Sequence, residues 1–196
     1  MITIAGLKEL EKNSLLPLAE IMENAGLAVS EEINARSDLK NKKIIIFAWH
    51  GNNSGDGFVA AHHLSKKADV NIFFLGKEKK LTDLARQKYE RVKRLITKDL
   101  DKKEIQEADI LIDAMLGTGV KGEIQEPLAS AIDLFNSSFA SKVSIDVPTG
   151  INPDTGEKAN KFINPDLIIT MHDMKPGLLQ FKEKVIVKDV GLKQRK

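Results

Sequence analysis

Short apolar segments alternate with longer amphipathic ones along this chain, and the alternation predicts its fold. The apolar segments are rich in β-branched and aromatic residues, which is typical of buried strands. We expect strands at 43–49, 69–75, 108–113 and 142–146, and two more at 166–171 and 184–187. Apolar residues recur at helical spacing in the intervening segments, so the predicted helices are 15–36, 55–66, 81–96 and 127–135. Buried strands that alternate with helices indicate an α/β fold with three layers and a mostly parallel central sheet.

Length and composition narrow the class of protein. The chain has 196 residues, 42% hydrophobic and 30% charged, which suits a single globular domain over residues 1–196. It has no cysteine, so disulfides, thiol nucleophiles and cysteine-based zinc sites are excluded. A formal net charge of +2 gives no argument for binding nucleic acid, and no apolar run is long enough to span a membrane. Because the N-terminus also lacks the features of a secretory signal, we expect a cytoplasmic protein with no nucleic-acid or membrane partner.

Three polar, glycine-containing segments follow predicted strands and carry the candidate chemistry. They are Gly51–Gly57, Asp113–Gly119 and Asp146–Gly150. The first resembles a loop that faces an anion, but it matches neither the dinucleotide fingerprint nor the Walker A loop. Ligands of parallel sheets bind beyond the carboxyl ends of the strands, so we expect the three segments to share one crevice. Their polar side chains are Asn52, Asn53, Asp56, Asp113, Asp146 and Thr149.

The crevice would offer only oxygen ligands. Amide, carboxylate and hydroxyl oxygens suit a hard cation, monovalent or divalent, better than zinc or copper. Converging carboxylates repel one another unless a cation neutralises them or one takes up a proton. A single aspartate at a strand end is more often a helix cap than a ligand, so the prediction depends on their convergence.

Five motifs, in this order, resemble the YjeF N-terminal domain, the NAD(P)H-hydrate epimerase family. They are Met22–Gly26, Gly51–Gly57, Asp113–Gly119, Ser144–Ile151 and Lys175–Leu178, and the resemblance extends from about Leu7 to Leu192. It implies a Rossmann-like fold, often dimeric, that interconverts the R and S epimers of hydrated NADH and NADPH (NADHX and NADPHX). It also implies a bound potassium ion and a partner dehydratase that uses the S epimer, which in many relatives belongs to the same chain.

The resemblance also assigns individual residues. It implies that potassium is held by Asn53, Asp113 and Thr149. It implies substrate contacts by Asn52, Asn53, Ser54, Gly55, Asp56, Gly117, Thr118, Gly119, Val120, Lys121, Gly122, Glu123 and Asp146. The chain departs from the family pattern at Trp49 and Ser54, where glycines are usual, and at Thr149, where serine is usual.

The chemistry of the substrate suggests one catalytic residue. The C6 hydroxyl of NADHX is bonded to a carbon next to the ring nitrogen, so the nitrogen can expel it as water and leave a planar centre. Water that returns to the other face completes the epimerisation, which requires an acid and a base. We expect Asp146 to supply this group, with Asp56 as second choice because Asp56 can be used as a helix cap.

Other side chains have less specific interpretations. His172 and His50 are possible crevice residues, but a triad of Ser54, His172 and Asp146 lacks the G-x-S-x-G elbow. Glu23 and Asn24 could reach the crevice or a dimer partner. The helix around Tyr89 is expected to have an ordinary exposed face.

Two other functions remain open at this stage. One is a non-catalytic nucleotide- or protein-binding scaffold built on the same domain. The other is a different enzyme that acts on a phosphorylated or nucleotide substrate in the same crevice. The sequence does not distinguish a stand-alone epimerase from a fragment of a bifunctional enzyme.

Overall fold

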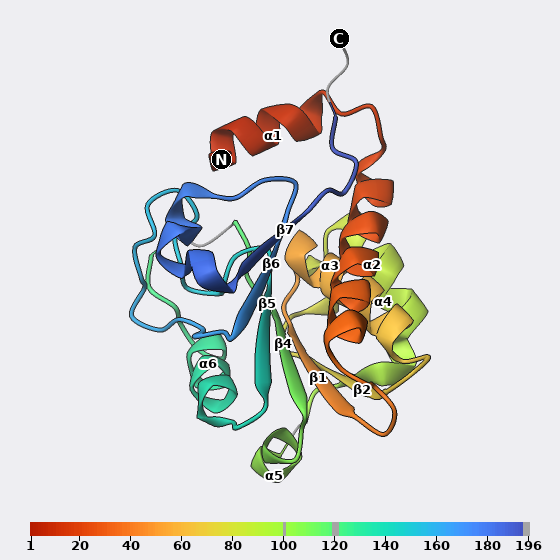
Figure 1. Cartoon of the computed structure of the whole chain (residues 1–196). Helices are drawn as coiled ribbons and strands as arrows, with labels where there is room; N and C mark the ends of the chain where they lie inside the picture. Colours follow the sequence, from red (N-terminus) through yellow and green to blue (C-terminus); the bar gives the residue numbers. More distant parts are fainter. Residues whose placement is uncertain (100, 119–121, 194–196) are drawn as a thin grey trace.

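A single sheet of seven parallel strands forms the centre of the computed structural model, which describes residues 1–99, 101–118 and 122–193 (Figure 1). In sheet order the strands are β3 (Ile96–Thr97), β2 (Asp69–Phe74), β1 (Lys43–Ala48), β4 (Ile110–Ala114), β5 (Ser141–Ile145), β6 (Leu167–Met171) and β7 (Val185–Lys188). The chain builds outward from β1 to β3 and then returns to β4 on the other side of β1. The predicted α/β fold with a parallel central sheet is confirmed.

Helices cover both faces of the sheet. They are α1 (Ile4–Lys12), α2 (Leu18–Arg36), α3 (Asn52–Leu64), α4 (Asp83–Val92), α5 (Lys102–Gln106) and α6 (Leu128–Ser137), with shorter-pitch helices η1 (Glu78–Lys80), η2 (Lys93–Leu95) and η3 (Pro176–Lys184). Helices α2, α3 and α4 lie on one face, and α6 and η3 lie on the other (Figure 1). Helix α1 crosses above the sheet, near the carboxyl ends of the strands. None of the described helices is both long and apolar enough to cross a membrane.

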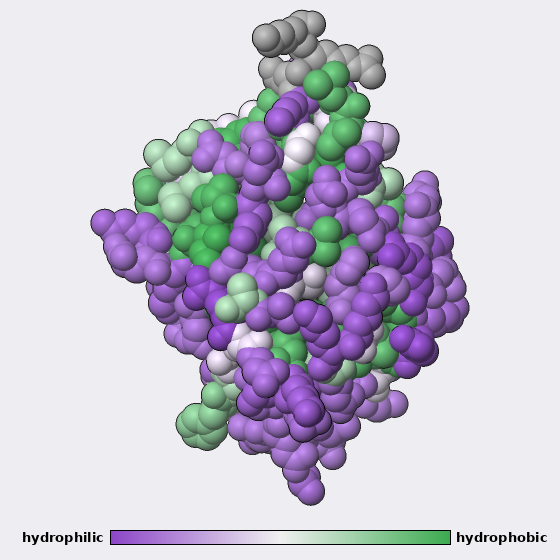
Figure 2. All heavy atoms as spheres, turned by 45° about the vertical axis from the view of Figure 1, so that its right-hand side comes forward, coloured by the Kyte–Doolittle hydropathy of each residue, from purple (hydrophilic) through white to green (hydrophobic). Residues whose placement is uncertain are grey.

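The two cores follow from the alternation of side chains along each strand. Ile44 and Ile46 pack against the α2–α4 layer, whereas Ile45 and Phe47 pack against the α6 layer. Figure 2 brings the α2–α4 side forward and shows a mostly hydrophilic surface, as expected for amphipathic helices whose apolar faces point inward. Because strands covered on both faces are apolar at nearly every position, their sequences were sufficient to locate six of the seven strands.

The elements that the sequence analysis missed are short or weakly apolar. Strand β3 has two residues and α5 has five, and neither length gives a recognisable period. Helix α1 has nine residues, none of them fully buried. The predicted helix 81–96 ends at Val92, after which η2 and β3 follow.

The prediction of a loop before a helix that starts at residue 55 is wrong, because α3 begins at Asn52 and includes the rest of the Gly51–Gly57 segment. Its glycines serve close packing instead. A Cβ on Gly55 would lie 2.5 Å from Sδ of Met22, and one on Gly57 would lie 2.5 Å from Cβ of Ala114. The start of α3 therefore fits tightly between α2 and β4.

The same layer corrects the interpretation of Tyr89. Its side chain is 2% exposed and packs edge-on against Phe58, while its hydroxyl donates to Glu78 at 2.8 Å.

Glu23 accepts hydrogen bonds from Lys88 and Arg91, each at 2.7 Å, so it joins α2 to α4. These two ion pairs lower the pKa of Glu23 to about 2, although burial opposes the shift.

The crossing of α2 and α3 gives a stability prediction. A Cβ on Gly26 would lie 2.4 Å from Cβ of Val59 and 2.6 Å from the backbone oxygen of Asp56, so Gly26→Ala should force the helices apart. We expect a loss of about 1–3 kcal/mol in the free energy of unfolding, measured with urea. Gly6→Ala is the control, because on α1 the new methyl meets only the flexible side chains of Ile2 and Thr3 within 3.4 Å. That variant should keep or slightly raise stability, and equal losses in both would contradict the packing argument.

Candidate functional site

A cavity of about 410 Å³ lies at the carboxyl ends of the strands, near the point where the strand order reverses between β1 and β4. Its floor carries polar side chains from the strand ends and from the start of α3. Its upper wall consists of α1, the start of α2 and the segment after β7. The floor residues include Asn52, Asn53, Asp56, Gly117, Thr118, Asp146, His172 and Lys175, and the upper wall includes Ile4, Leu7, Lys8, Glu11, Leu18, Ile21, Met22, Val190 and Leu192.

Asp146 and Lys175 form a buried ion pair in the floor. Lys175 is 0% exposed, and its Nζ donates to Asp146 Oδ1, to Thr170 Oγ1 at 2.9 Å and to the backbone oxygen of Met171 at 2.8 Å. All three ammonium donors are thereby used. Asp146 itself has φ +64°, a conformation that is uncommon for a residue with a side chain, although aspartate adopts it more readily than most.

Asp56 is the second carboxyl of the floor. It lies in the second turn of α3 and makes no side-chain hydrogen bond to any described residue, so it is not the helix cap that the sequence analysis considered. Its side chain is partly buried and lines the cavity. Burial raises the pKa of Asp56 well above its usual range, and the carboxylates of Asp146 and Glu11 raise it further, whereas Lys175 and Lys88 act in the opposite direction.

Glu11 is a third carboxyl, and it reaches the cavity from α1. Burial raises its pKa, the charge of Asp146 raises it further, and Lys175 and Lys8 lower it. The sequence analysis missed Glu11 because it missed the helix that carries it. It named Lys175 only as part of a motif, because nothing in a lysine's local sequence predicts that the side chain will be buried.

The three proposed ion ligands lie in one neighbourhood. The Asp113 carboxylate is 0% exposed and accepts four hydrogen bonds, from the Thr149 amide (2.8 Å), the Thr149 hydroxyl (2.7 Å), the Met115 amide (3.2 Å) and the Ser144 hydroxyl (3.1 Å). Burial raises its pKa to about 6, although these hydrogen bonds oppose the shift. Among the described residues, no basic side chain forms an ion pair with it.

Asn53 is the member of this group whose side-chain amide has no hydrogen-bond partner among the described residues. Its Oδ1 and Nδ2 are both buried without a partner among the described residues, and its side chain packs against the backbone of Gly117. An orphaned amide oxygen near an unpaired buried carboxylate suits a hard cation. Because Asp113 already accepts four hydrogen bonds, its oxygens could ligate an ion only while shared with those donors.

Some residues expected at the substrate lie elsewhere. The Ser54 hydroxyl accepts from the Trp49 amide and donates to the backbone oxygen of Ala114, both at 2.8 Å, so it joins the ends of β1 and β4. Gly55 packs on Met22, and neither Ser54 nor Gly55 lines the cavity. Gly122 and Glu123 are exposed and also lie outside its lining. Gly119, Val120 and Lys121 lie outside the described residues.

The aromatic and histidine positions are now placed. Trp49 packs in the α6-side core and its ring lies 4.4 Å from that of His50, so Trp49 does not line the cavity. Burial, followed by the charges of Lys80 and Lys77, lowers the pKa of His50. His172 does line the cavity, with φ +66°, but it adjoins Asp173 and not a nucleophilic serine.

Comparison with known proteins shows the family of this chain. Residues 18–177 match the family model described as "YjeF-related protein N-terminus". The chain is 45% identical to the "Bifunctional NAD(P)H-hydrate repair enzyme Nnr" of Archaeoglobus fulgidus, an alignment that covers 88% of this chain and 37% of that protein. It is 38% identical to the "NAD(P)H-hydrate epimerase" of Nitrosopumilus maritimus, where 83% of this chain and 79% of the relative are covered.

The solved structures agree with the fold. The crystal structure of the yeast protein Ynu0 (YNL200c) superposes with a TM-score of 0.82 at 22% identity, covering 96% of this chain and 87% of the yeast chain. The chain spans little more than a third of the bifunctional relatives, 37% of the Archaeoglobus enzyme, and most of the relatives that are named as epimerases. Because the family model covers more than four-fifths of the chain, this protein belongs to the family of YjeF-related N-terminal domains.

Proposed function

We propose that this protein is an epimerase that interconverts the R and S forms of NADHX and NADPHX. One observation carries the proposal: Asp146 and Asp56 converge on a cavity at the switch point of the sheet. The chain aligns with most of the length of two relatives that are named NAD(P)H-hydrate epimerase, which supports the same reaction. The alternative of a non-catalytic scaffold has no comparable support, because a scaffold has no need for a strained aspartate beside a fully buried lysine.

The floor of the cavity provides an acid and a base on one side of the ring. Asp146 forms an ion pair with Lys175, so its carboxylate is placed to accept a proton from an attacking water. Asp56, whose pKa is strongly raised, is suited to remain protonated and to donate a proton to a leaving hydroxyl. The developing positive charge on the ring would lie close to the carboxylate of Asp146, in surroundings that are partly apolar.

A coupled assay tests the proposed function. R-NADHX is supplied with a dehydratase that uses only the S epimer, and the appearance of NADH is followed by absorbance. We expect this protein to allow repair of the whole R pool at a rate that depends on its concentration. If the rate equals spontaneous epimerisation with potassium present, the proposed function is wrong.

Asp146→Asn separates the catalytic role of this residue from its structural one. Turnover should fall by about 100-fold or more, because the carboxylate is lost. The change also leaves Lys175 buried without its counter-ion, which we expect to lower the free energy of unfolding by about 3–5 kcal/mol. Combining it with Lys175→Met should recover much of that stability, measured with urea, but none of the activity. Recovery of turnover in the stabilised double variant would show that Asp146 has no catalytic role.

We also propose that a potassium ion is held by Asn53, Asp113 and Thr149. The orphaned amide of Asn53 and the unpaired charge of Asp113 support this proposal. A bound cation would neutralise the buried carboxylate and would fix the segment from Asp113 to Gly117 that borders the cavity.

Thermal unfolding detects binding of the ion through the melting temperature, so this test does not depend on activity. Potassium chloride should raise the melting temperature by a few degrees over choline chloride at equal ionic strength, because the ion binds only the folded state. Asn53→Ala should remove this difference. Asn52→Ala is the control, since Asn52 is exposed and accepts from the Thr82 hydroxyl at 2.7 Å. A potassium effect that survives in Asn53→Ala would contradict the assignment.

The remaining expectations stay proposals of the same kind. We propose that residues 1–196 act as one domain in the cytoplasm, in partnership with a dehydratase that consumes the S epimer. The bifunctional names of several relatives support a dehydratase partner. We also propose the homodimer that the resemblance implies, and sedimentation velocity would test it.

A further inference from the structure

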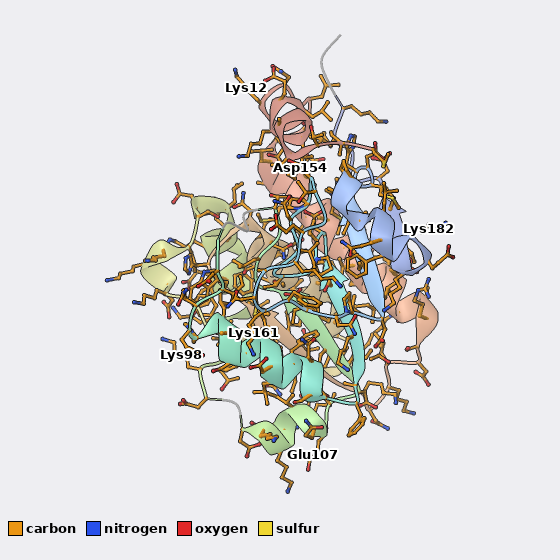
Figure 3. The ribbon with its side chains drawn as sticks, turned by 90° about the vertical axis from the view of Figure 1, so that its left-hand side faces the viewer. Lys12, Lys98, Glu107, Asp154, Lys161 and Lys182 are labelled. Carbon is orange, nitrogen blue, oxygen red and sulfur yellow. The ribbon has the colours of Figure 1, made fainter. Side chains whose placement is uncertain are left out.

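Helix α1 forms the roof of the cavity, directly above the carboxyl ends of the strands (Figure 1). Four of its residues line the cavity at helical spacing, namely Ile4, Leu7, Lys8 and Glu11. The N-terminal end is held where the amide of Ile4 donates to Asp154 Oδ1 at 2.8 Å. Figure 3 shows Asp154 beneath the helix and Lys12 on its outer side. One face of α1 is therefore fixed over the polar floor.

Glu11 differs from the other acidic residue of this helix. Glu9 is exposed, and its carboxylate accepts a hydrogen bond from Asn13 at 2.6 Å. Glu11 is half-buried, lines the cavity, and makes no side-chain hydrogen bond or ion pair with any described residue. Burying a carboxyl without a partner is unfavourable, and nothing in the packing of α1 requires an acid there.

The charges around Glu11 place it near the reacting groups. The cavity that it faces also contains Lys8 on its own helix, Asp56 on α3, Asp146 after β5, and His172 and Lys175 after β6. Asp146 and Lys175 both act on the ionisation of Glu11, and Glu11 acts on that of Asp56. Because all of these side chains line the same cavity, the roof and floor carboxyls face one volume.

We propose that Glu11 is a further catalytic carboxyl, which acts from the roof on the face of the nicotinamide ring opposite Asp146 and Asp56. The inference rests on the proposed epimerase function. Epimerisation needs proton transfer on both faces of the ring, because the hydroxyl leaves from one face and water enters from the other. A carboxyl in the floor can serve one face, and Glu11 is the acid that the structure places on the other wall.

The proposed reaction balances over the two carboxyls. When the hydroxyl points to the roof, protonated Glu11 gives its proton to that oxygen, the C6–O bond breaks, and water leaves as the ring nitrogen forms a double bond to C6. Water then forms a C6–O bond from the floor side and loses its proton to the Asp146 carboxylate. The enzyme ends with Glu11 ionised and Asp146 protonated, which is the form that catalyses the reverse conversion.

Glu11→Gln tests the proposal in the coupled assay, with Glu9→Gln as the matched control on the outer face of the same helix. We expect kcat for epimerisation to fall by about 100-fold or more in Glu11→Gln, while KM for NADHX changes little. Glu9→Gln should retain wild-type kcat and KM. Glu11→Asp, which keeps a carboxyl on a shorter side chain, should retain more activity than Glu11→Gln.

Each other outcome is informative. A Glu11→Gln variant with wild-type kcat, or with a raised KM and unchanged kcat, would overturn the catalytic role of Glu11. Equal losses in Glu11→Gln and Glu9→Gln would also overturn it, since they would point to the packing of α1. Urea unfolding of both variants shows whether the fold is retained. Inactive wild-type protein would instead contradict the proposed epimerase function, so the two failures are distinguishable.

Discussion

The floor of the site depends on the buried ion pair between Lys175 and Asp146. A lysine that is 0% exposed is stable only when its charge is neutralised and its donors are used, and this lysine meets both conditions. Its three acceptors lie on Asp146, Thr170 and Met171, so the ammonium holds the end of β5 against the end of β6. Asp146 makes this contact from a left-handed backbone conformation, with φ +64°.

The ion pair also sets the charge of the cavity. Lys175 is paired with one of three carboxyls, and neither Asp56 nor Glu11 has a cationic partner of its own among the described residues. Burial and the charge of Asp146 raise the pKa values of both groups, and Glu11 raises that of Asp56 further. A cavity with one carboxylate in an ion pair and two carboxyls of raised pKa is suited to both give and accept protons. This difference between Asp146 and the other two carboxyls follows from the position of the Lys175 ammonium group.

The sequence predicted the parts of this arrangement that local pattern determines. Residues 44–48 are buried on both faces of the sheet, so the strand is a continuous apolar run that the sequence shows directly. Asp146 and Asn53 were predicted to share a crevice because ligands of parallel sheets bind beyond the carboxyl ends of the strands. The structure places both in the lining of the cavity. The start of α3 was misassigned because glycine usually indicates a turn, whereas here Gly55 and Gly57 permit close packing. The burial of Lys175 depends on its contact with Asp146, and the position of Glu11 depends on how α1 crosses the sheet. Both involve residues that are distant in sequence, so no local pattern predicts them.

The two walls of the cavity have opposite character, and the contrast suits the chemistry. The floor is polar, while the upper wall is largely apolar, with Leu18, Ile21 and Met22 from α2 and Val190 and Leu192 after β7. Apolar walls lower the local dielectric constant, which strengthens the attraction between a carboxylate and a positively charged ring. A wall of this kind is effective only if its polar members are few and placed at the reacting atom, and Glu11 is the acidic residue in the part of the upper wall that the structure describes.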